Sequence, residues 1–150
     1  MSIEVVNRQR LIPVDSRRIE AIGRALLVAV KNETRAATVA IVRERLIREL
    51  NRRYRGLNDA TDVLSFPASG SGEEKGGAAA MADDETEGYL GDVVISVETA
   101  VRQAAEAGHT VEREIDELVI HGLLHLCGYD HANDRGEMNR LELKLRRKLL

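Results

Sequence analysis

Three of the four histidines in the chain lie within eleven residues, at the spacing H-x3-H-x5-H, and are His121, His125 and His131. Positions i and i+4 of an α-helix lie on one face, so His121 and His125 can point to the same place. Gly128 can end this helix in the left-handed conformation, and the next turn can bring His131 back toward the pair. Catalytic zinc is typically bound by three protein ligands such as imidazoles, which leave its fourth coordination position open. The sequence therefore predicts a site for one divalent metal ion, and Zn2+ is expected there.

The same spacing, with Gly128 between the last two histidines, matches the H-E-x-x-H-x-x-G-x-x-H signature of the metzincin proteases. Gly122 stands where those proteases have the glutamate that acts as general base. A peptidase of that mechanism would lack its base, so the sequence disfavours a metallopeptidase. Glycine costs about 1 kcal/mol relative to alanine in a helix interior, which suggests that a backbone, a metal or a substrate approaches closely at this position.

Other residues near the histidines could support the metal site or have an ordinary structural role. A carboxylate often holds a metal-binding imidazole in place, and Glu114, Glu117 and Asp130 are candidates for this role, although each is equally well explained as a solvated charge. Cys127 is two positions from His125, so on a continuous helix it points away from the metal and is expected in the core. His109 is expected to be an ordinary core or surface residue.

Six arginines lie within thirteen residues, at positions 43, 45, 48, 52, 53 and 55. A solvated helical face is the usual explanation of such a run. Arg52, Arg53 and Arg55, however, cluster where the predicted helix ends and where helical spacing no longer explains them. Guanidinium groups at this position could hold phosphates and stabilise developing negative charge.

Bulk properties restrict the class of protein. The 150 residues suffice for one domain with a single core, and the formal net charge of −3 excludes a general polycation, so a site for a polyanion must be local. One cysteine excludes an internal disulfide, and no apolar run is long enough for a signal peptide or a membrane span. We expect a cytoplasmic protein without a membrane partner. G-x-G-x-x-G and Walker motifs are absent, so nothing indicates nucleotide binding.

Hydrophobic periodicity and turn signals divide the chain into nine elements. Strands are predicted at 2–7, 38–42, 61–66 and 90–97. Helices are predicted at 16–31, 44–54, 98–106, 111–127 and 135–149. Residues 68–88 are rich in glycine, serine, alanine and acidic side chains, which predicts a flexible loop. The fold class expected for 1–150 is α+β, a single domain with a small mixed four-stranded sheet covered by about five helices, and the metal site on a C-terminal helix and the turn after it.

Three blocks of the sequence resemble one known family. HGLLHLCGYDH at 121–131 is similar to the H-G-x-L-H-L-x-G-Y-D-H signature of the YbeY family of bacterial metal-dependent endoribonucleases and rRNA maturation factors. LNRRYRG…TDVLSFP at 50–67 and LGDVVIS at 90–96 agree in the same order. The stretch at 70–87 departs from the family pattern, so family contacts in that loop do not carry over.

The resemblance implies a zinc-type ion held by His121, His125 and His131, with Arg55 as the catalytic arginine lining the cleft opposite the metal. It also implies cleavage of single-stranded RNA in rRNA maturation, at the 3′ end of small-subunit rRNA, and a role in ribosome quality control. The implied partners are ribosomal RNA and ribosomal or pre-ribosomal particles. The alternative is a non-catalytic ribosome assembly factor with a structural metal. The native metal, the attacking oxygen, the general base, the natural cleavage site and the oligomeric state do not follow from the sequence.

Overall fold

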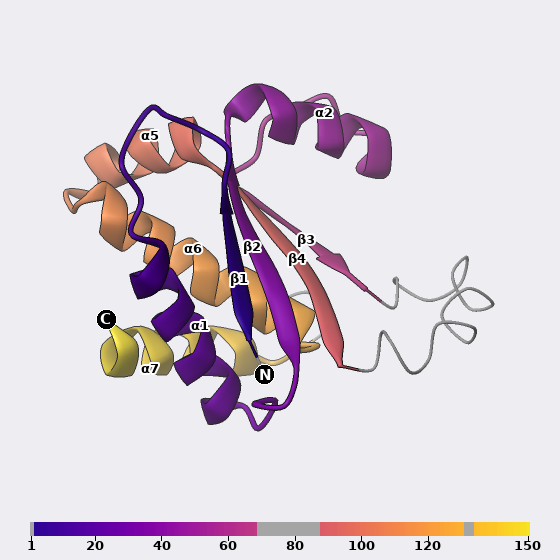
Figure 1. Ribbon diagram of the computed structural model, residues 1–150, viewed down its shortest axis with the longest axis vertical. Helices are drawn as coiled ribbons and strands as arrows, with labels where there is room; N and C mark the ends of the chain where they lie inside the picture. Colours follow the sequence, from indigo (N-terminus) through magenta and orange to yellow (C-terminus); the bar gives the residue numbers. More distant parts are fainter. Residues whose placement is uncertain (1, 69–87, 131–133) are drawn as a thin grey trace.

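A four-stranded mixed sheet forms the centre of the protein in a computed structural model that describes residues 2–68, 88–130 and 134–150 (Figure 1). Its strands are β1 (Ile3–Asn7), β2 (Ala36–Val42), β3 (Val63–Pro67) and β4 (Tyr89–Ser96). They lie in the order β1-β2-β4-β3. β1 and β4 both pair with β2 in parallel, whereas β3 pairs with β4 antiparallel and forms an edge of the sheet.

Five helices accompany this sheet in the described part of the chain. They are α1 (Ser16–Ala29), α2 (Glu44–Arg55), α5 (Val97–Ala107), α6 (Val111–Leu126) and α7 (Glu137–Leu149). In Figure 1, α1, α6 and α7 lie together beside the strands, while α2 stands apart at the top. This is a single small α+β domain, as the sequence predicted.

The two faces of the sheet differ in what covers them. Alternate strand residues point to opposite faces, so Val39, Ile41, Val93 and Ile95 join the large core formed with α1, α5, α6 and α7. Val94 points the other way, into a small cluster beneath α2 that is completed by Val42, Ile47 and Leu64. The large core therefore fixes α6, whereas α2 is held by much less apolar surface.

The predicted helices and strands are confirmed, and their ends shift by two residues or fewer. Two predicted helix starts are also present, because the Asp15 side chain accepts from Arg18 N–H and the Thr110 hydroxyl accepts from Arg113 N–H. The predicted loop at 68–88 lies, except for its two end residues, outside the described residues. Its flexibility therefore stays a prediction.

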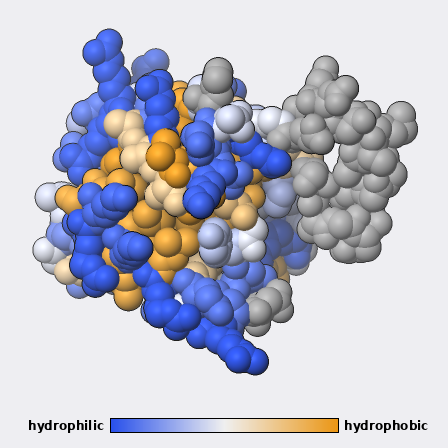
Figure 2. Space-filling view, turned by 90° about the horizontal axis from the view of Figure 1, so that it is seen from below, coloured by the Kyte–Doolittle hydropathy of each residue, from blue (hydrophilic) through white to orange (hydrophobic). Residues whose placement is uncertain are grey.

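Apolar side chains also reach the surface on the face seen from below, between hydrophilic ones that project outward (Figure 2). Small domains cannot cover all their apolar area with polar groups, so such exposure is ordinary. Within the described residues, none of the helices combines the length and the apolar character needed to cross a bilayer.

α2 is fastened to the rest of the molecule at its first turn by Glu98 of α5. One carboxylate oxygen of Glu98 accepts from Arg43 Nε at 2.7 Å, and the other accepts from the backbone N–H of Glu44. Burial acts to raise the pKa of the Glu98 carboxyl, but these hydrogen bonds and the Arg43 charge outweigh it, so the pKa is lowered. Only Ile47 and Asn51 of α2 are buried, so this link is a substantial part of its attachment.

We expect Glu98→Gln to lower the free energy of unfolding by about 1 kcal/mol at pH 7. Because the folded-state pKa is below the unfolded value, the contribution of Glu98 is present above the usual carboxyl range near 4.5 and is lost as the pH falls below it. Urea unfolding of both proteins at pH 7 and in acid measures the difference. A gap that stays constant on acidification would contradict this assignment.

Candidate functional site

The end of α6 places two of the predicted metal ligands side by side. His121 and His125 have ring centroids 4.7 Å apart and an interplanar angle of 75°. Gly128, at φ 100°, ends the helix: its N–H donates to the His125 carbonyl at 3.0 Å, and Tyr129 N–H donates to the Leu124 carbonyl at 3.1 Å. The chain turns here as predicted. His131, the third predicted ligand, lies outside the described residues.

Gly122 lies between the two histidines and explains how close the helix comes to the sheet. A Cβ added at this position would lie 2.5 Å from Cγ1 of Val93 on β4. The Gly122 carbonyl also accepts from the hydroxyl of Ser65 on β3 at 3.1 Å. The predicted close approach is therefore made by the sheet. It holds the histidine-bearing turns of α6 against β3 and β4.

A cavity of about 720 Å³ opens beside the two histidines. It is lined by Arg55, Thr61, Asp62, Val63, Leu64, Ser65, Pro67, His121, His125, Gly128, Tyr129 and Asp130. This volume is within the usual range of ligand sites. The structure thus brings His121, His125 and Arg55, three of the residues selected from the sequence, to the wall of one cavity, and Asp130 lines it as well.

Arg55 is the last residue of α2, before Gly56 ends the helix in the left-handed conformation at φ 72°. The buried Asn51 side chain donates to the Asp59 carbonyl at 3.0 Å and so shapes the loop that leaves the helix. The resulting turn directs the chain from α2 to the cavity-lining strand β3.

Ion pairs distinguish Arg55 from most of the other arginines of α2. Arg43 pairs with Glu98, Arg48 with Glu44, and both Arg52 and Arg53 pair with Glu49. Arg45 and Arg55 have no carboxylate partner among the described residues. Only Arg55 of these two lines the cavity, so its charge is available to an anion beside the histidines.

Glu142 of α7 holds His121 in place, a contact that the sequence did not predict. His121 Nδ1 lies 3.1 Å from Glu142 Oε1, and Arg146 donates to Glu142 Oε2 at 2.8 Å. Burial acts to raise the pKa of this carboxyl, but the contacts with His121 and Arg146 outweigh it and lower the pKa. A charged carboxylate only accepts, so Nδ1 carries the proton and a metal ion would be bound by Nε2. This oriented imidazole fits a divalent metal.

A signal for Glu142 exists in the sequence. Met138, Glu142 and Leu145 follow helical spacing on the buried side of α7, where a carboxylate requires a partner. The identity of that partner, 21 residues earlier in the chain, could not be read from the spacing.

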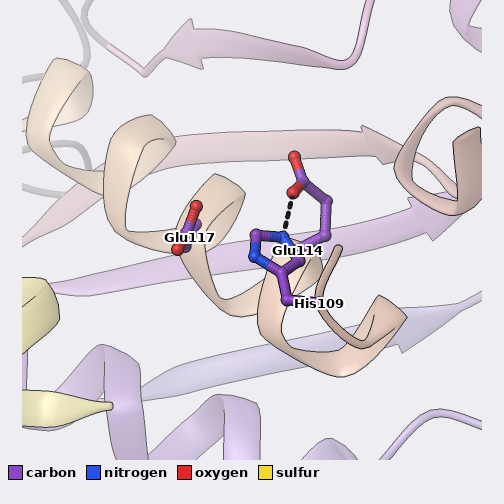
Figure 3. Close-up of side chains that lie close together, drawn as sticks. All are labelled: His109, Glu114 and Glu117. Carbon is purple, nitrogen blue, oxygen red and sulfur yellow. Dashed lines mark hydrogen bonds and ion pairs between the residues drawn. The ribbon is translucent and has the colours of Figure 1, made fainter. Parts of the chain in front are cut away.

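Glu114 and Glu117, two predicted neighbours of the metal ligands, have other partners. His109 Nε2 lies 2.6 Å from Glu114 Oε1 (Figure 3). Glu117 accepts from Arg113 at 2.8 Å and forms an ion pair with Arg146 at 3.3 Å. His109, Glu114 and Glu117 offer ligand atoms within 4.8 Å of one another and could hold a metal ion. The two arginines already neutralise Glu117, so an ion-pair network also accounts for this group.

Cys127 packs against the large core, as predicted for it. Its thiol is partly buried, and this burial raises its pKa. A raised pKa keeps the thiol protonated near neutral pH, whereas the thiolate is the form that binds metals. Cys127 therefore has a packing role.

Known proteins with related sequences share nearly the whole chain. A family model described as Endoribonuclease YbeY matches residues 4–149. The protein named Endoribonuclease YbeY from Moorella thermoacetica is 41% identical over 140 residues, which cover 91% of this chain and 88% of the relative. The protein of the same name from Caldicellulosiruptor bescii is 42% identical over 152 residues, covering 95% and 93%. The similarity thus includes both the histidine segment and the arginine segment.

A solved structure has a similar fold. The solution structure of a Thermotoga maritima protein superposes with a TM-score of 0.62 at 27% sequence identity. The match covers 98% of this chain and 88% of the other. The arrangement of helices around the mixed sheet is therefore shared with an experimentally determined protein.

We expect Gly122→Ala to lower the free energy of unfolding by about 1 kcal/mol. Overpacking against Val93 costs roughly 1–3 kcal/mol, and the better helix propensity of alanine returns about 1 kcal/mol. The loss should shrink in a Val93→Ala background, where the added methyl has room, and urea unfolding of the four proteins measures this coupling. Stabilisation by Gly122→Ala in the otherwise unchanged protein would show that the sheet does not limit this position.

We expect Glu142→Gln to weaken zinc binding about tenfold, because the carboxylate that orients His121 is lost. Glu117→Gln is the matched control, since Glu117 shares the Arg146 partner but bonds to Arg113 and Arg146 and not to His121. Competition with a chromophoric chelator gives the affinity of each folded variant. Equal zinc affinities in the two variants would refute the orienting role.

Proposed function

The chain belongs to the YbeY endoribonuclease family, and from this premise we propose that it is a metal-dependent endoribonuclease that cleaves single-stranded RNA in rRNA maturation. The observation that carries the proposal is the shared cavity of His121, His125 and Arg55. Imidazoles suit a divalent metal, and a guanidinium suits a phosphate, so the two walls together suit a phosphodiester. The volume of about 720 Å³ is sufficient for part of an RNA strand.

His121, His125 and His131 are the proposed ligands of one divalent metal, with zinc expected. The contact between Glu142 and His121 supports this, because such carboxylates commonly fix the orientation of metal-binding imidazoles. When bound, the metal would supply Lewis-acid polarisation of the scissile phosphate and activation of the nucleophile. Both His121 and His125 line the cavity, where the RNA would lie.

Arg55 is the proposed catalytic arginine. Its guanidinium would bind the scissile phosphate and neutralise the negative charge that develops during cleavage. Among the described residues no carboxylate competes for Arg55, whereas three other arginines of α2 and Arg43, just before the helix, are ion-paired. A donor that meets the charge developing on the phosphate acts mainly in the transition state, so removing it should affect the rate of cleavage more than the affinity for RNA.

The biological setting is proposed from the family. The relatives are named endoribonucleases, and the resemblance in the histidine block implies rRNA as substrate. We propose processing at the 3′ end of small-subunit rRNA and participation in ribosome quality control, in the cytoplasm. Pre-ribosomal particles are the proposed partners.

A non-catalytic ribosome assembly factor is the main alternative. The open cavity beside the histidines favours catalysis, because a purely structural metal site is normally closed by its protein ligands. A metallopeptidase is disfavoured further by Gly122, whose position is filled by the approach of Val93, so that no side chain could act as base there.

The proposal predicts that the purified, zinc-loaded protein cleaves single-stranded RNA and that a chelator or His125→Ala abolishes the cleavage. Arg55→Ala should lower kcat by about 10²–10³-fold, as for loss of a donor to developing charge. Cleavage is followed with a short end-labelled RNA on denaturing gels.

Arg45→Ala is the matched control for Arg55→Ala. Arg45 is on the same helix, also lacks a carboxylate partner among the described residues, and does not line the cavity. It should change cleavage by no more than about twofold at moderate salt. Activity that survives chelation, His125→Ala and Arg55→Ala alike would come from a contaminant, and ribosome binding without any cleavage would favour the assembly factor.

A further inference from the structure

Aromatic residues are scarce in this chain, which has three tyrosines and one phenylalanine. Tyr89 has a structural role, because its hydroxyl contacts Thr38 and Asp92 within the sheet. Of the other three aromatics, Tyr129 lines the cavity. Phe66 and Tyr54 do not line it: Phe66 lies between the lining residues Ser65 and Pro67 on β3, and Tyr54 immediately precedes the lining residue Arg55.

Tyr54 is the most exposed large hydrophobic residue of the described chain, with 62% of its surface accessible. It is nevertheless held in a fixed contact, since its ring and that of Phe66 have centroids 5.6 Å apart at an interplanar angle of 72°. Phe66 in turn packs against the small cluster beneath α2. An edge-to-face contact restrains a ring without covering all of it, so an aromatic surface remains accessible next to the cavity-lining Arg55.

The charge beside this ring completes a known pattern of recognition. Tyr54 and Arg55 are consecutive residues in the last turn of α2 and project about 100° apart around the helix axis, so the ring lies beside a phosphate held by Arg55 and within reach of a neighbouring base. Proteins that bind single-stranded nucleic acid combine cationic contacts to phosphates with aromatic side chains on which unpaired bases stack. Bases inside an A-form duplex are stacked on one another and do not offer their faces.

We propose that Tyr54, supported by Phe66, stacks on an unpaired nucleobase next to the phosphate bound by Arg55 and thereby selects single-stranded over double-stranded RNA. The inference rests on the proposed function, because the occupant is a base of the RNA substrate. Tyr54 is a specificity-determining residue in this scheme and takes no part in bond cleavage. Tyr54→Phe retains the stacking ring, whereas Tyr54→Ala removes it.

The test measures binding of a fluorescent 2′-O-methylated single-stranded RNA to zinc-loaded protein at fixed salt, and a denaturing gel verifies that the strand is still intact after each measurement. Tyr54→Ala should weaken binding about tenfold, and Tyr54→Phe should stay within about twofold of the unchanged protein. Leu46→Ala removes another exposed apolar side chain of α2 and is the matched control, which should bind normally. Thermal melting verifies that each variant is folded.

A second arm changes the RNA instead of the protein. An abasic nucleotide is placed at each position in turn, and one position should weaken binding to the unchanged protein about tenfold. At that position the abasic RNA should bind Tyr54→Ala no more weakly than the complete RNA does, because both changes remove the same contact. Binding of a complementary duplex should be the same for the unchanged protein and Tyr54→Ala.

The outcomes separate this inference from the proposed function. Normal binding by Tyr54→Ala would overturn the stacking role. The same follows if the losses caused by the abasic nucleotide and by Tyr54→Ala are independent and multiply at every position. In either case cleavage by the unchanged protein would still support the nuclease. If the abasic nucleotide and Tyr54→Ala weaken binding through the same contact at one position, but an unmodified strand is not cleaved, the stacking role is supported and the nuclease activity is refuted. If the unchanged protein neither binds nor cleaves RNA, both the stacking role and the nuclease are overturned.

Discussion

The close approach of α6 to the sheet is the contact on which the arrangement of the site depends. Gly122 allows the helix to lie directly on Val93, and the same turn carries His121 and His125. A side chain at this position would move the helix outward and carry both imidazoles away from β3. The glycine that removes a protease-type base is thus the residue that brings the histidines to the cavity edge. The close packing of α6 on Val93 explains the glycine at position 122 more simply than a catalytic role does.

Charge in the interior is organised around the same helix. Glu142 contacts His121 and Arg146, and Arg146 also pairs with Glu117, so a network of ionised groups joins α6 and α7. Burying a carboxylate is costly unless each charge is paired. The pairing lowers the pKa of Glu142 in spite of its burial and keeps it ionised. The last helix therefore contributes to the site by controlling the orientation of one imidazole, at a distance from the cavity opening.

The sequence predicts local features better than those that depend on distant pairing. Helical and alternating periodicity give the helices and strands, and the i, i+4 spacing puts His121 beside His125, because these effects act within a few residues. The strand order β1-β2-β4-β3 depends on contacts between remote segments. Glu142 illustrates the same limit: its buried helical position could be read from the chain, but its partner could not. The lack of a carboxylate partner that distinguishes Arg55 from Arg48, Arg52 and Arg53 also depends on the folded structure and cannot be read from the sequence.

The two walls of the cavity differ in how firmly they are held. The histidines belong to a helix packed into the large core on several sides. Arg55 and Tyr54 end a helix that buries only Ile47 and Asn51 and is hydrogen-bonded to Glu98 at its opposite end. Regions with few buried contacts open at lower free energy than the core does. RNA bound in the cavity would therefore meet imidazoles held by the large core and, from α2, the Arg55 guanidinium with the Tyr54 ring next to it, whose ordering is part of the cost of binding.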